Sequence, residues 1–315
     1  MDLLLEVART VRAAVLPHLG SPSHRTGTGT AVGGDVTFGI DDIAEDVATN
    51  VLEQAAGDGL AWYTEDRGLQ VRGDPRRLIV LDPIDGTRPA GAGLESCCVS
   101  VASTRFDPHA TLGDVDEGLV LEIKSGVLFR ARRGKGVRII DRGETRGPSL
   151  GTAASLDGAF WIYGLRGRPT MPSAIVLEEL IDASGVSGGT FDLGSAAFAM
   201  CNVVSGRFDA YVDQGQRLID DVPSTKPLFE AVAGGAILNN SPYDIAASLL
   251  ICTEAGCTVT DAAGRPLEER PLVGSGDGFT LSTLATCTPE LHGEILAKLD
   301  RGIERLRRSE VARGA

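Results

Sequence analysis

The sequence has little of the chemistry on which disulfide-bonded and zinc-binding proteins depend. Its six cysteines include no Cys-x-x-Cys pair. Its four histidines are scattered along the chain, without the spacing typical of zinc ligands. We therefore expect reduced, mostly buried thiols and no zinc site.

Long apolar runs are also missing. No stretch approaches the ~18 uninterrupted apolar residues of a membrane-spanning helix. The first segment, MDLLLEVARTVRAAVLPHLG, is apolar enough to suggest a signal peptide, but charges at Asp2, Glu6, Arg9 and Arg12 interrupt it. Its apolar residues recur at helical spacing, which predicts an amphipathic helix. We expect a cytoplasmic protein with no membrane partner.

Positive charge is scarce, since 30 Lys and Arg stand against 43 Asp and Glu, a net charge of −13. This balance, without a stripe of basic and aromatic residues, disfavours a nucleic-acid polymer or an anionic membrane as the main partner. The chain also lacks the G-x-x-x-x-G-K-S/T phosphate-binding loop. An anionic substrate would need local help from metal ions or helix N-termini.

The chain divides into two halves of different pattern. Between residues 97 and 140, strand-like segments alternate with Gly and Arg-Gly turns, as in an antiparallel meander. Beyond a polar, turn-rich stretch at 142–155, helices and strands alternate, which is typical of α/β packing. We predict an N-terminal α+β subdomain over 1–150 and a C-terminal α/β subdomain over 151–315, with an irregular stretch at 214–241.

Acidic residues begin or end several apolar elements. Taken singly, each has an ordinary explanation as a helix cap, a solvated turn or a first-turn acid favoured by the helix dipole. Elements that end at the same edge would bring several carboxylates together, and hard divalent cations relieve the resulting repulsion. The four clusters are Asp41-Asp42, Glu65-Asp66, Asp82 with Asp85, and Asp244.

The sharpest cluster lies in LDPIDGT, directly after the apolar run Leu78–Leu81. Pro83 fixes its φ and donates no N–H, so the strand must turn there. The turn lets Asp82 and Asp85 converge and leaves the Ile84 carbonyl free to face the same ion. This segment therefore predicts a metal site at the end of a strand.

The next two residues suit an anion. Gly86 lets the backbone approach a ligand closely, and Thr87 offers a hydroxyl beside backbone N–H groups that could hold phosphate. Haloacid-dehalogenase phosphatases also place acids and a threonine after a strand, but with D-x-D-x-T spacing. Here the two acids are three residues apart with proline between them, so that geometry is not reproduced.

These motifs resemble the inositol monophosphatase and fructose-1,6-bisphosphatase superfamily of magnesium-dependent, lithium-sensitive phosphatases. LDPIDGT is similar to its first signature, and SPYDIAASLLICTEAGCTVTD to its second, with Tyr243 in place of the customary tryptophan. Weaker similarities follow the expected order: VTFGIDDIAED, TED, FRARRGKG and GSAAFAMCNVVSGRFDAY. The resemblance spans roughly residues 30 to 265 and implies a layered αβαβα sandwich.

The resemblance also implies roles for individual residues. Two or three Mg²⁺ ions would be held by Glu65, Asp82, the Ile84 carbonyl, Asp85 and Asp244. Asp41, with Glu65, would help hold a third ion or the nucleophilic water, and Thr87 would hydrogen-bond that water. The catalytic residues would thus be Glu65, Thr87 and Asp41, and the substrate would be bound by Asp85, Gly86, Thr87, Asp192, Gly194, Ser195 and Ala196.

Three features depart from the family pattern. Arg88-Pro89-Ala90 replaces the usual x-N-F. The replacement reflects either sequence drift in a segment that only supports the site or a pocket reshaped for another substrate. Asp192 stands where arginine or serine is common, and would disfavour a second phosphate and favour a leaving group with hydroxyls or an amine. The stretch at 214–241 is longer than the corresponding stretch of the family. It is either a surface insertion or a lid or dimer element near the active site. It contains Asp220-Asp221, but Asp244 matches the signature position.

We therefore expect a Mg²⁺-dependent phosphomonoesterase that acts on a small soluble ester: an inositol phosphate, a sugar phosphate or a nucleotide-derived phosphate. The family resemblance implies a homodimer. The alternative is a non-catalytic relative that binds a metabolite on the same fold.

Overall fold

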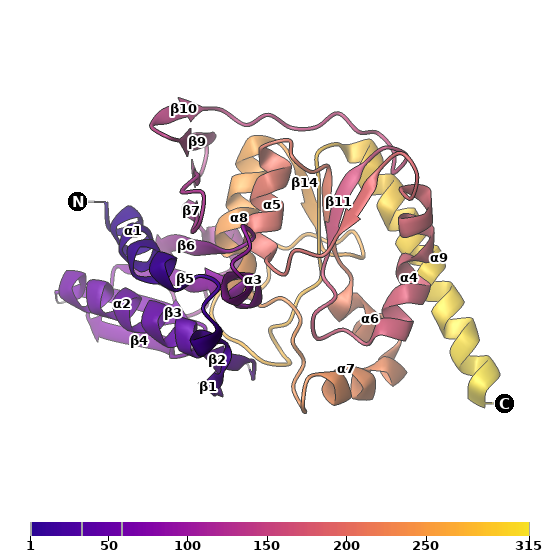
Figure 1. Ribbon diagram of the computed structural model, residues 1–315, viewed down its shortest axis with the longest axis horizontal. Helices are drawn as coiled ribbons and strands as arrows, with labels where there is room; N and C mark the ends of the chain where they lie inside the picture. The colour runs from indigo at the N-terminus through magenta and orange to yellow at the C-terminus, as the bar shows by residue number, and fades with distance from the viewer. Residues whose placement is uncertain (1, 33, 58, 315) are drawn as a thin grey trace.

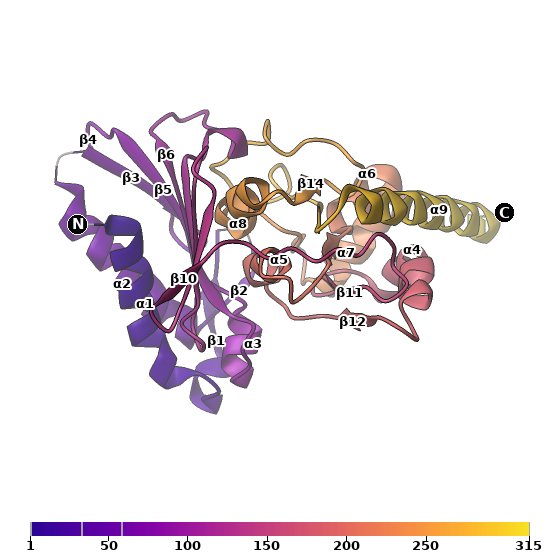
Figure 2. The ribbon, with the colours of Figure 1, turned by 90° about the horizontal axis from the view of Figure 1, so that it is seen from above.

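The computed structural model describes residues 2–32, 34–57 and 59–314. Its elements form five layers in the order helix, sheet, helix, sheet, helix, which Figure 1 and Figure 2 show from two directions. The layered αβαβα sandwich is confirmed. Within the described residues, no helix is both long enough and apolar enough to cross a membrane.

The first sheet has eight strands, and the helices α1 (Leu3–Val15) and α2 (Gly39–Ala56) cover one of its faces. Neighbouring strands run antiparallel except β3 and β5, which are parallel. The spatial order is β10 (Glu144–Arg146), β9 (Val137–Asp141), β8 (Leu128–Arg132), β7 (Glu117–Glu122), β6 (Cys98–Arg105), β5 (Arg77–Asp85), β3 (Gly59–Thr64) and β4 (Gly68–Gly73). The predicted antiparallel meander is therefore confirmed.

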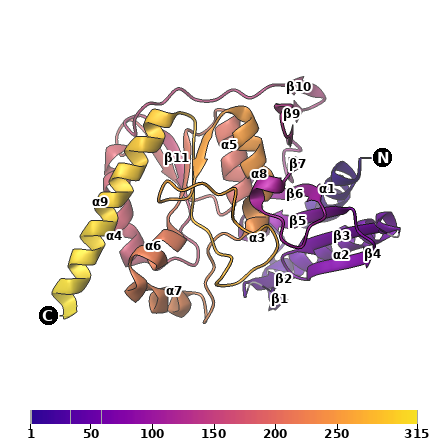
Figure 3. The ribbon, with the colours of Figure 1, turned by 180° about the vertical axis from the view of Figure 1, so that it is seen from behind.

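The other face of this sheet packs on α5 (Ala196–Val204) and α8 (Pro242–Ala255), which form the middle layer. Behind them lies the second sheet, and α4 (Thr170–Ala183) and α9 (Pro289–Gly314) cover its far side (Figure 3). Its strands, in spatial order, are β12 (Gly189–Phe191), β11 (Phe160–Tyr163), β13 (Ala210–Asp213), β15 (Thr283–Thr286) and β14 (Thr258–Thr260).

Shorter elements connect these layers. A two-stranded hairpin precedes α2, and a short helix follows β5. These elements are β1 (Gly27–Thr30), β2 (Val36–Phe38), α3 (Thr87–Ala92), α6 (Gly215–Asp221), α7 (Lys226–Val232) and the 3₁₀ turns Leu16–His18, Pro22–Arg25, Leu112–Asp114 and Pro223–Thr225.

The first helix shows how local sequence and packing agree. Asp2 caps it, because its carboxylate accepts a hydrogen bond from the Leu5 amide at 3.4 Å. Its apolar residues recur at helical spacing and form one buried stripe against β6 and β7. The predicted amphipathic helix is therefore confirmed.

Two parts of the sequence interpretation differ from the structure. The stretch at 214–241, predicted to be irregular, forms α6 and α7, and buries Leu218 and Phe229 in the core of the second sheet. That prediction was wrong because helices of this length are held by tertiary packing, not by their own sequence. The helix α9 and the strand β15 were not predicted at all.

The histidine at the start of α9 makes stability depend on pH. His292 is buried, and its ring nitrogens contact the hydroxyls of Thr260 at 2.9 Å and Thr286 at 3.1 Å. Burial lowers the pKa of His292 to about 4. Between about pH 6.5 and 4 the unfolded chain therefore binds a proton that the folded protein does not, so stability is lost as the pH falls.

We predict that His292 lowers the free energy of unfolding by up to about 3 kcal/mol as the pH falls through this window. The His292→Gln variant keeps a buried polar side chain but does not titrate. Denaturant unfolding of both proteins at pH 7 and pH 4.5 measures the effect as a difference between the two pH dependences. Equal pH dependences would contradict the assignment.

Candidate active site

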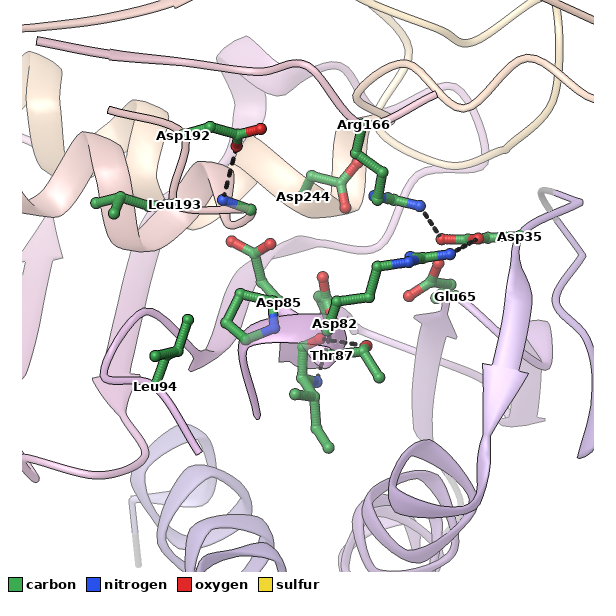
Figure 4. Close-up of a pocket in the computed structure, with 15 residues that line it drawn as sticks. Asp35, Glu65, Asp82, Asp85, Thr87, Leu94, Arg166, Asp192, Leu193 and Asp244 are labelled. Carbon is green, nitrogen blue, oxygen red and sulfur yellow. Dashed lines mark hydrogen bonds and ion pairs between the residues drawn. The ribbon is translucent and has the colours of Figure 1, made fainter. Parts of the chain in front are cut away.

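The two aspartates of LDPIDGT lie on β5, where a bulge interrupts the strand. Asp82 pairs with Ser100 of β6 and Asp85 with Cys98, so four residues on one strand span three on the other. On a regular strand, residues three apart point to opposite faces. The extra residue brings both carboxylates to the same side (Figure 4).

A third acid comes from the neighbouring strand. β3 runs parallel to β5, and Thr64 pairs with Leu81, so the chain leaves both strands at the same edge. Glu65 follows directly and lies beside Asp82 in the cavity, and its Oε1 is 3.4 Å from the hydroxyl of Tyr243. The expected gathering of acids at one sheet edge therefore occurs here.

The fourth acid is supplied by the middle layer. Asp244 lies in the first turn of α8, where its Oδ2 accepts a hydrogen bond from the Ser241 amide at 2.5 Å. Asp244 is thus both an acid in the first turn of a helix, where the helix dipole favours it, and a member of the acidic cluster. Carboxylate oxygens of Asp82, Asp85 and Asp244 lie within 4.8 Å of one another.

Each of these three aspartates uses only one of its two oxygens within the protein. Oδ1 of Asp82 accepts from the Ile84 amide at 3.0 Å, and Oδ2 of Asp85 accepts from the Ser195 hydroxyl at 2.7 Å. The second oxygen of Asp82, Asp85 and Asp244 has no hydrogen-bond donor among the residues the structure describes. The protein therefore orients each carboxylate and leaves one oxygen of each for a ligand.

The cluster is electrostatically unfavourable as it stands. Two ionised carboxylates at this separation repel by about 3 kcal/mol at a dielectric constant typical of protein sites. Burial and the neighbouring acids raise the pKa of Glu65 and Asp82 well above the ordinary range. Burial also raises the pKa of Asp85 and of Asp244, although hydrogen bonds from Ser195 and Ser241 oppose the shift.

This donor set fits a hard divalent cation. It consists of buried and half-buried carboxylate oxygens, with the Ile84 carbonyl nearby, and contains neither nitrogen nor sulfur ligands. A cation would pair the oxygens that lack donors and remove the repulsion between them. These are five of the residues that the sequence proposed as metal ligands: Glu65, Asp82, Ile84, Asp85 and Asp244.

A threonine and an aspartate form a hydrogen-bonded pair at the edge of the cluster. The Thr87 hydroxyl donates to Asp41 Oδ1 at 2.8 Å and also lies 3.2 Å from the Ile84 carbonyl. Asp41 is the third residue of α2 and not its N-cap, and its Oδ2 accepts from the Phe38 amide at 2.9 Å. Burial raises the pKa of Asp41 to about 7, despite both hydrogen bonds.

Gly86 links the metal ligands to this pair. Its φ of 96° lies in the left-handed region. A Cβ there would lie 2.5 Å from the Ser96 carbonyl oxygen and 3.0 Å from Ser195 Cβ. Only glycine fits, so the residue fixes how β5 turns into α3.

Only some of the remaining residues predicted to bind the substrate line the cavity. Asp192 and Gly194 line the cavity, and Asp192 lies on the same side of the cavity as Leu193 (Figure 4). Ser195 uses its hydroxyl to cap α5 and to hold Asp85, while Ala196 lines a smaller adjoining cavity of about 50 Å³. Asp220-Asp221 are not among the residues that line either cavity, and pair with arginines elsewhere.

The cavity has a volume of about 340 Å³ and contains residues that the sequence interpretation missed. Asp35 lies in the β1–β2 loop and forms ion pairs with Arg88, next to Thr87, and with Arg166, in the loop after β11. Burial raises the pKa of Asp35, but Arg166 and Arg88 more than offset this, so the pKa lies below its ordinary value. No local sequence signal marks Asp35 or Arg166.

The fold and the family match together define the class of this protein. A model of the inositol monophosphatase family matches residues 3–304. The chain therefore belongs to the inositol monophosphatase family and is a phosphoric monoester hydrolase.

Individual relatives agree with this assignment. A fructose-1,6-bisphosphatase/inositol-1-monophosphatase of Methanothermobacter thermautotrophicus is 30% identical over 253 residues, which cover 76% of this chain and 84% of the relative. A bifunctional NADP phosphatase/NAD kinase of Methanococcus maripaludis is 28% identical over 277 residues, or 84% of this chain. The match covers 44% of that longer relative.

The solved structure of a Thermotoga maritima IMPase has the same fold. It superposes with a TM-score of 0.68 at 21% identity, over 97% of this chain and 98% of that one.

We predict that Asp82→Asn stabilises the metal-free protein. Removing one buried charge relieves repulsion, so the free energy of unfolding in EDTA at pH 8 should rise by about 1–3 kcal/mol. Since the raised pKa of Asp82 makes the wild type lose stability as the pH rises above about 4, the gain should grow with pH. Chemical denaturation at pH 6 and pH 8 measures it.

The same substitution should remove the stabilisation that a divalent cation confers on the wild type. That stabilisation is about 2.7 kcal/mol when the cation is present at 100 times its dissociation constant. Asp157→Asn, at an exposed position outside the cavity, is the matched control and should change neither quantity. A destabilised Asp82→Asn protein in EDTA would contradict the electrostatic account.

Proposed function

We propose that the protein is a Mg²⁺-dependent phosphomonoesterase that hydrolyses a small soluble phosphate ester by attack of water. One observation carries the proposal: four buried or half-buried acids line a single cavity beside Thr87, whose hydroxyl is hydrogen-bonded to Asp41. Membership of the inositol monophosphatase family supports it.

Glu65, Asp82, the Ile84 carbonyl, Asp85 and Asp244 would hold the Mg²⁺ ions, two or three in number. When bound, Mg²⁺ supplies Lewis acidity toward phosphoryl oxygens and water and neutralises charge on the phosphoryl group. The protein's part is to orient the carboxylates, since the Ile84 amide, the Ser195 hydroxyl and the Ser241 amide hold one oxygen of each aspartate.

Thr87 and Asp41 would position and deprotonate the attacking water. The Thr87 hydroxyl already donates to Asp41, so its oxygen is left to accept a hydrogen bond from water. A proton taken from water can then pass through Thr87 to the Asp41 carboxylate. A carboxyl group with a pKa of about 7 is well matched to accept a proton near neutral pH. The Gly86 and Thr87 amides would bind the phosphoryl oxygens.

The cavity and the relatives support a small phosphate ester as the substrate. The cavity volume suits a sugar-sized ester, and the related enzymes named above act, by their names, on inositol phosphate, fructose bisphosphate or NADP. Asp192 on the cavity wall would accept hydrogen bonds from hydroxyl or amino groups of the leaving group.

We also propose that the protein is a cytoplasmic homodimer. Size-exclusion chromatography with light scattering would test the dimer.

A phosphatase screen tests the proposed function. Purified protein is incubated with inositol, sugar and nucleoside phosphates, with Mg²⁺ or with EDTA, and released phosphate is measured. We expect release from at least one ester only when Mg²⁺ is present. No release from any ester, by a folded protein loaded with Mg²⁺, would contradict the proposal.

We predict that Thr87→Val and Asp41→Asn each lower kcat by about 10²–10⁴-fold, because each breaks the path for the proton of the attacking water. Thr87→Ser keeps the hydroxyl and should retain most of the activity. Asp42→Asn, at the exposed neighbouring acid, is the control for charge at the start of α2. Wild-type kcat in both Thr87→Val and Asp41→Asn would contradict the assigned proton path.

A further inference from the structure

Glu65 differs from the three aspartates of the cluster in how its carboxylate is held. A backbone amide or a serine hydroxyl donates to one oxygen of Asp82, Asp85 and Asp244 at 2.5–3.0 Å. Glutamate has one more rotatable bond than aspartate, so its carboxylate is harder to fix. Among the described residues, the one hydrogen-bond donor to Glu65 is the hydroxyl of Tyr243, which lies 3.4 Å from Glu65 Oε1.

The backbone that carries Glu65 is fixed by the residue before it. Thr64, the last residue of β3, is fully buried, and its hydroxyl donates to the carboxylate of Glu45 in α2. The same hydroxyl accepts a hydrogen bond from the Arg67 amide at 3.3 Å, which closes the turn after β3. The position of Glu65 along the sheet edge is therefore set, and the rotation of its side chain remains to be fixed.

Tyr243 is well placed to fix this rotation. Its side chain is 5% exposed, and its ring stacks on Tyr63 of β3, with 6.0 Å between the ring centroids and 26° between the ring planes. The packed ring holds its polar tip beside Glu65, as is usual for a buried tyrosine whose hydroxyl has a hydrogen-bond partner. Because Tyr243 stands in place of the customary tryptophan, this hydroxyl is a feature of the present chain.

Neighbouring polar groups do not duplicate this contact. Arg166 attracts Glu65 through its charge, but it forms its ion pair with Asp35 and makes no hydrogen bond to Glu65 within the described part of the chain. A charge attracts both oxygens of a carboxylate, whereas a hydrogen bond selects one. The hydroxyl of Tyr63, in the same stack as Tyr243, is buried and has no hydrogen-bond partner among the described residues.

We propose that Tyr243 is a positioning residue that orients Glu65 as a metal ligand, because its hydroxyl donates to Oε1 and leaves Oε2 for the cation. This inference rests on the proposed function, in which Glu65 binds Mg²⁺. At 3.4 Å the hydrogen bond is longer than the usual ~2.7–2.8 Å between two oxygens, so it selects one oxygen without holding it tightly. Hydrogen bonds that orient metal-binding side chains contribute to metal affinity.

The place of Tyr243 in the chain connects two acids of the cluster. Asp244 is the next residue, so the first turn of α8 supplies one predicted ligand and orients a second. The second, Glu65, comes from the edge of the first sheet, and both face the same cavity (Figure 4). Loss of the Tyr243 hydroxyl should therefore weaken the cation site without removing a ligand.

Mn²⁺ binding tests the inference without relying on activity. Isothermal titration calorimetry of the full chain measures the dissociation constants, and the site that depends on Glu65 is the one lost in Glu65→Gln. We expect Tyr243→Phe to raise the dissociation constant of that site by about 10-fold. Tyr63→Phe removes the same group from the other ring of the stack, and should leave the constant unchanged.

The Mg²⁺ dependence of phosphatase activity gives a second readout. Tyr243→Phe should raise the Mg²⁺ concentration needed for half-maximal activity, while kcat at saturating Mg²⁺ stays close to that of the wild type. A merely structural role would lower kcat or stability and leave the metal requirement unchanged. In the Glu65→Gln protein, addition of Tyr243→Phe should not weaken Mn²⁺ binding further, because the two side chains act through one contact.

The outcomes separate the inference from the proposed function. Wild-type protein that binds no Mn²⁺, or that hydrolyses no ester with Mg²⁺, contradicts the proposed function. Mn²⁺ binding that is unchanged in Glu65→Gln overturns the assignment of Glu65 as a ligand and the inference with it. Wild-type affinity in Tyr243→Phe, equal weakening in Tyr63→Phe, or an effect that persists in the Glu65→Gln background overturns the inference alone. Weakening of the Glu65-dependent site in Tyr243→Phe and not in Tyr63→Phe supports it.

Discussion

The structure depends on one unfavourable arrangement, the enforced proximity of buried carboxylates at the end of β5. Asp82, Asp85 and Asp244 present oxygens within 4.8 Å of one another in a buried site, where like charges repel strongly. The surrounding protein holds them there through the β5 bulge and the first turn of α8. Without a cation, the repulsion within the cluster lowers the stability of the folded protein. A bound cation would remove this repulsion, so we interpret the arrangement as a cation site.

Much of the fold follows from this requirement. The parallel pair β3 and β5 delivers Glu65 and Asp82 to the same edge, α2 and α8 bring their first turns to it from opposite faces, and the N-terminus of α5 holds Asp85. The outer helix layer of α2, the first sheet and the middle helix layer therefore all contribute to one site. The chain thus uses secondary-structure ends, where side chains and amides are free, to build its chemistry.

The sequence motifs contain the acids that the structure brings together, and the predicted fold class is confirmed, but several elements and cavity residues were not predicted. The LDPIDGT and SPYDIAAS motifs located the acids because proline, glycine and helix-start residues act locally. Asp35 and Arg166 could not be found this way, because they lie in two loops 131 residues apart and meet only in the folded chain. The helix α9 was missed although its apolar residues, from Leu291 to Ile303, recur every four positions. The short helices α6 and α7 carry no comparable signal and depend on buried Leu218 and Phe229.

We expect the clustered acids at the end of β5 to bind divalent cations. The most direct measurement is anomalous X-ray diffraction from crystals of the full chain soaked in Mn²⁺, a substitute for Mg²⁺ with the same preference for oxygen ligands. We expect anomalous peaks among Asp82, Asp85, Asp244 and Glu65. Crystals whose Mn²⁺ lies only elsewhere, with these four carboxylates free of metal, would contradict it.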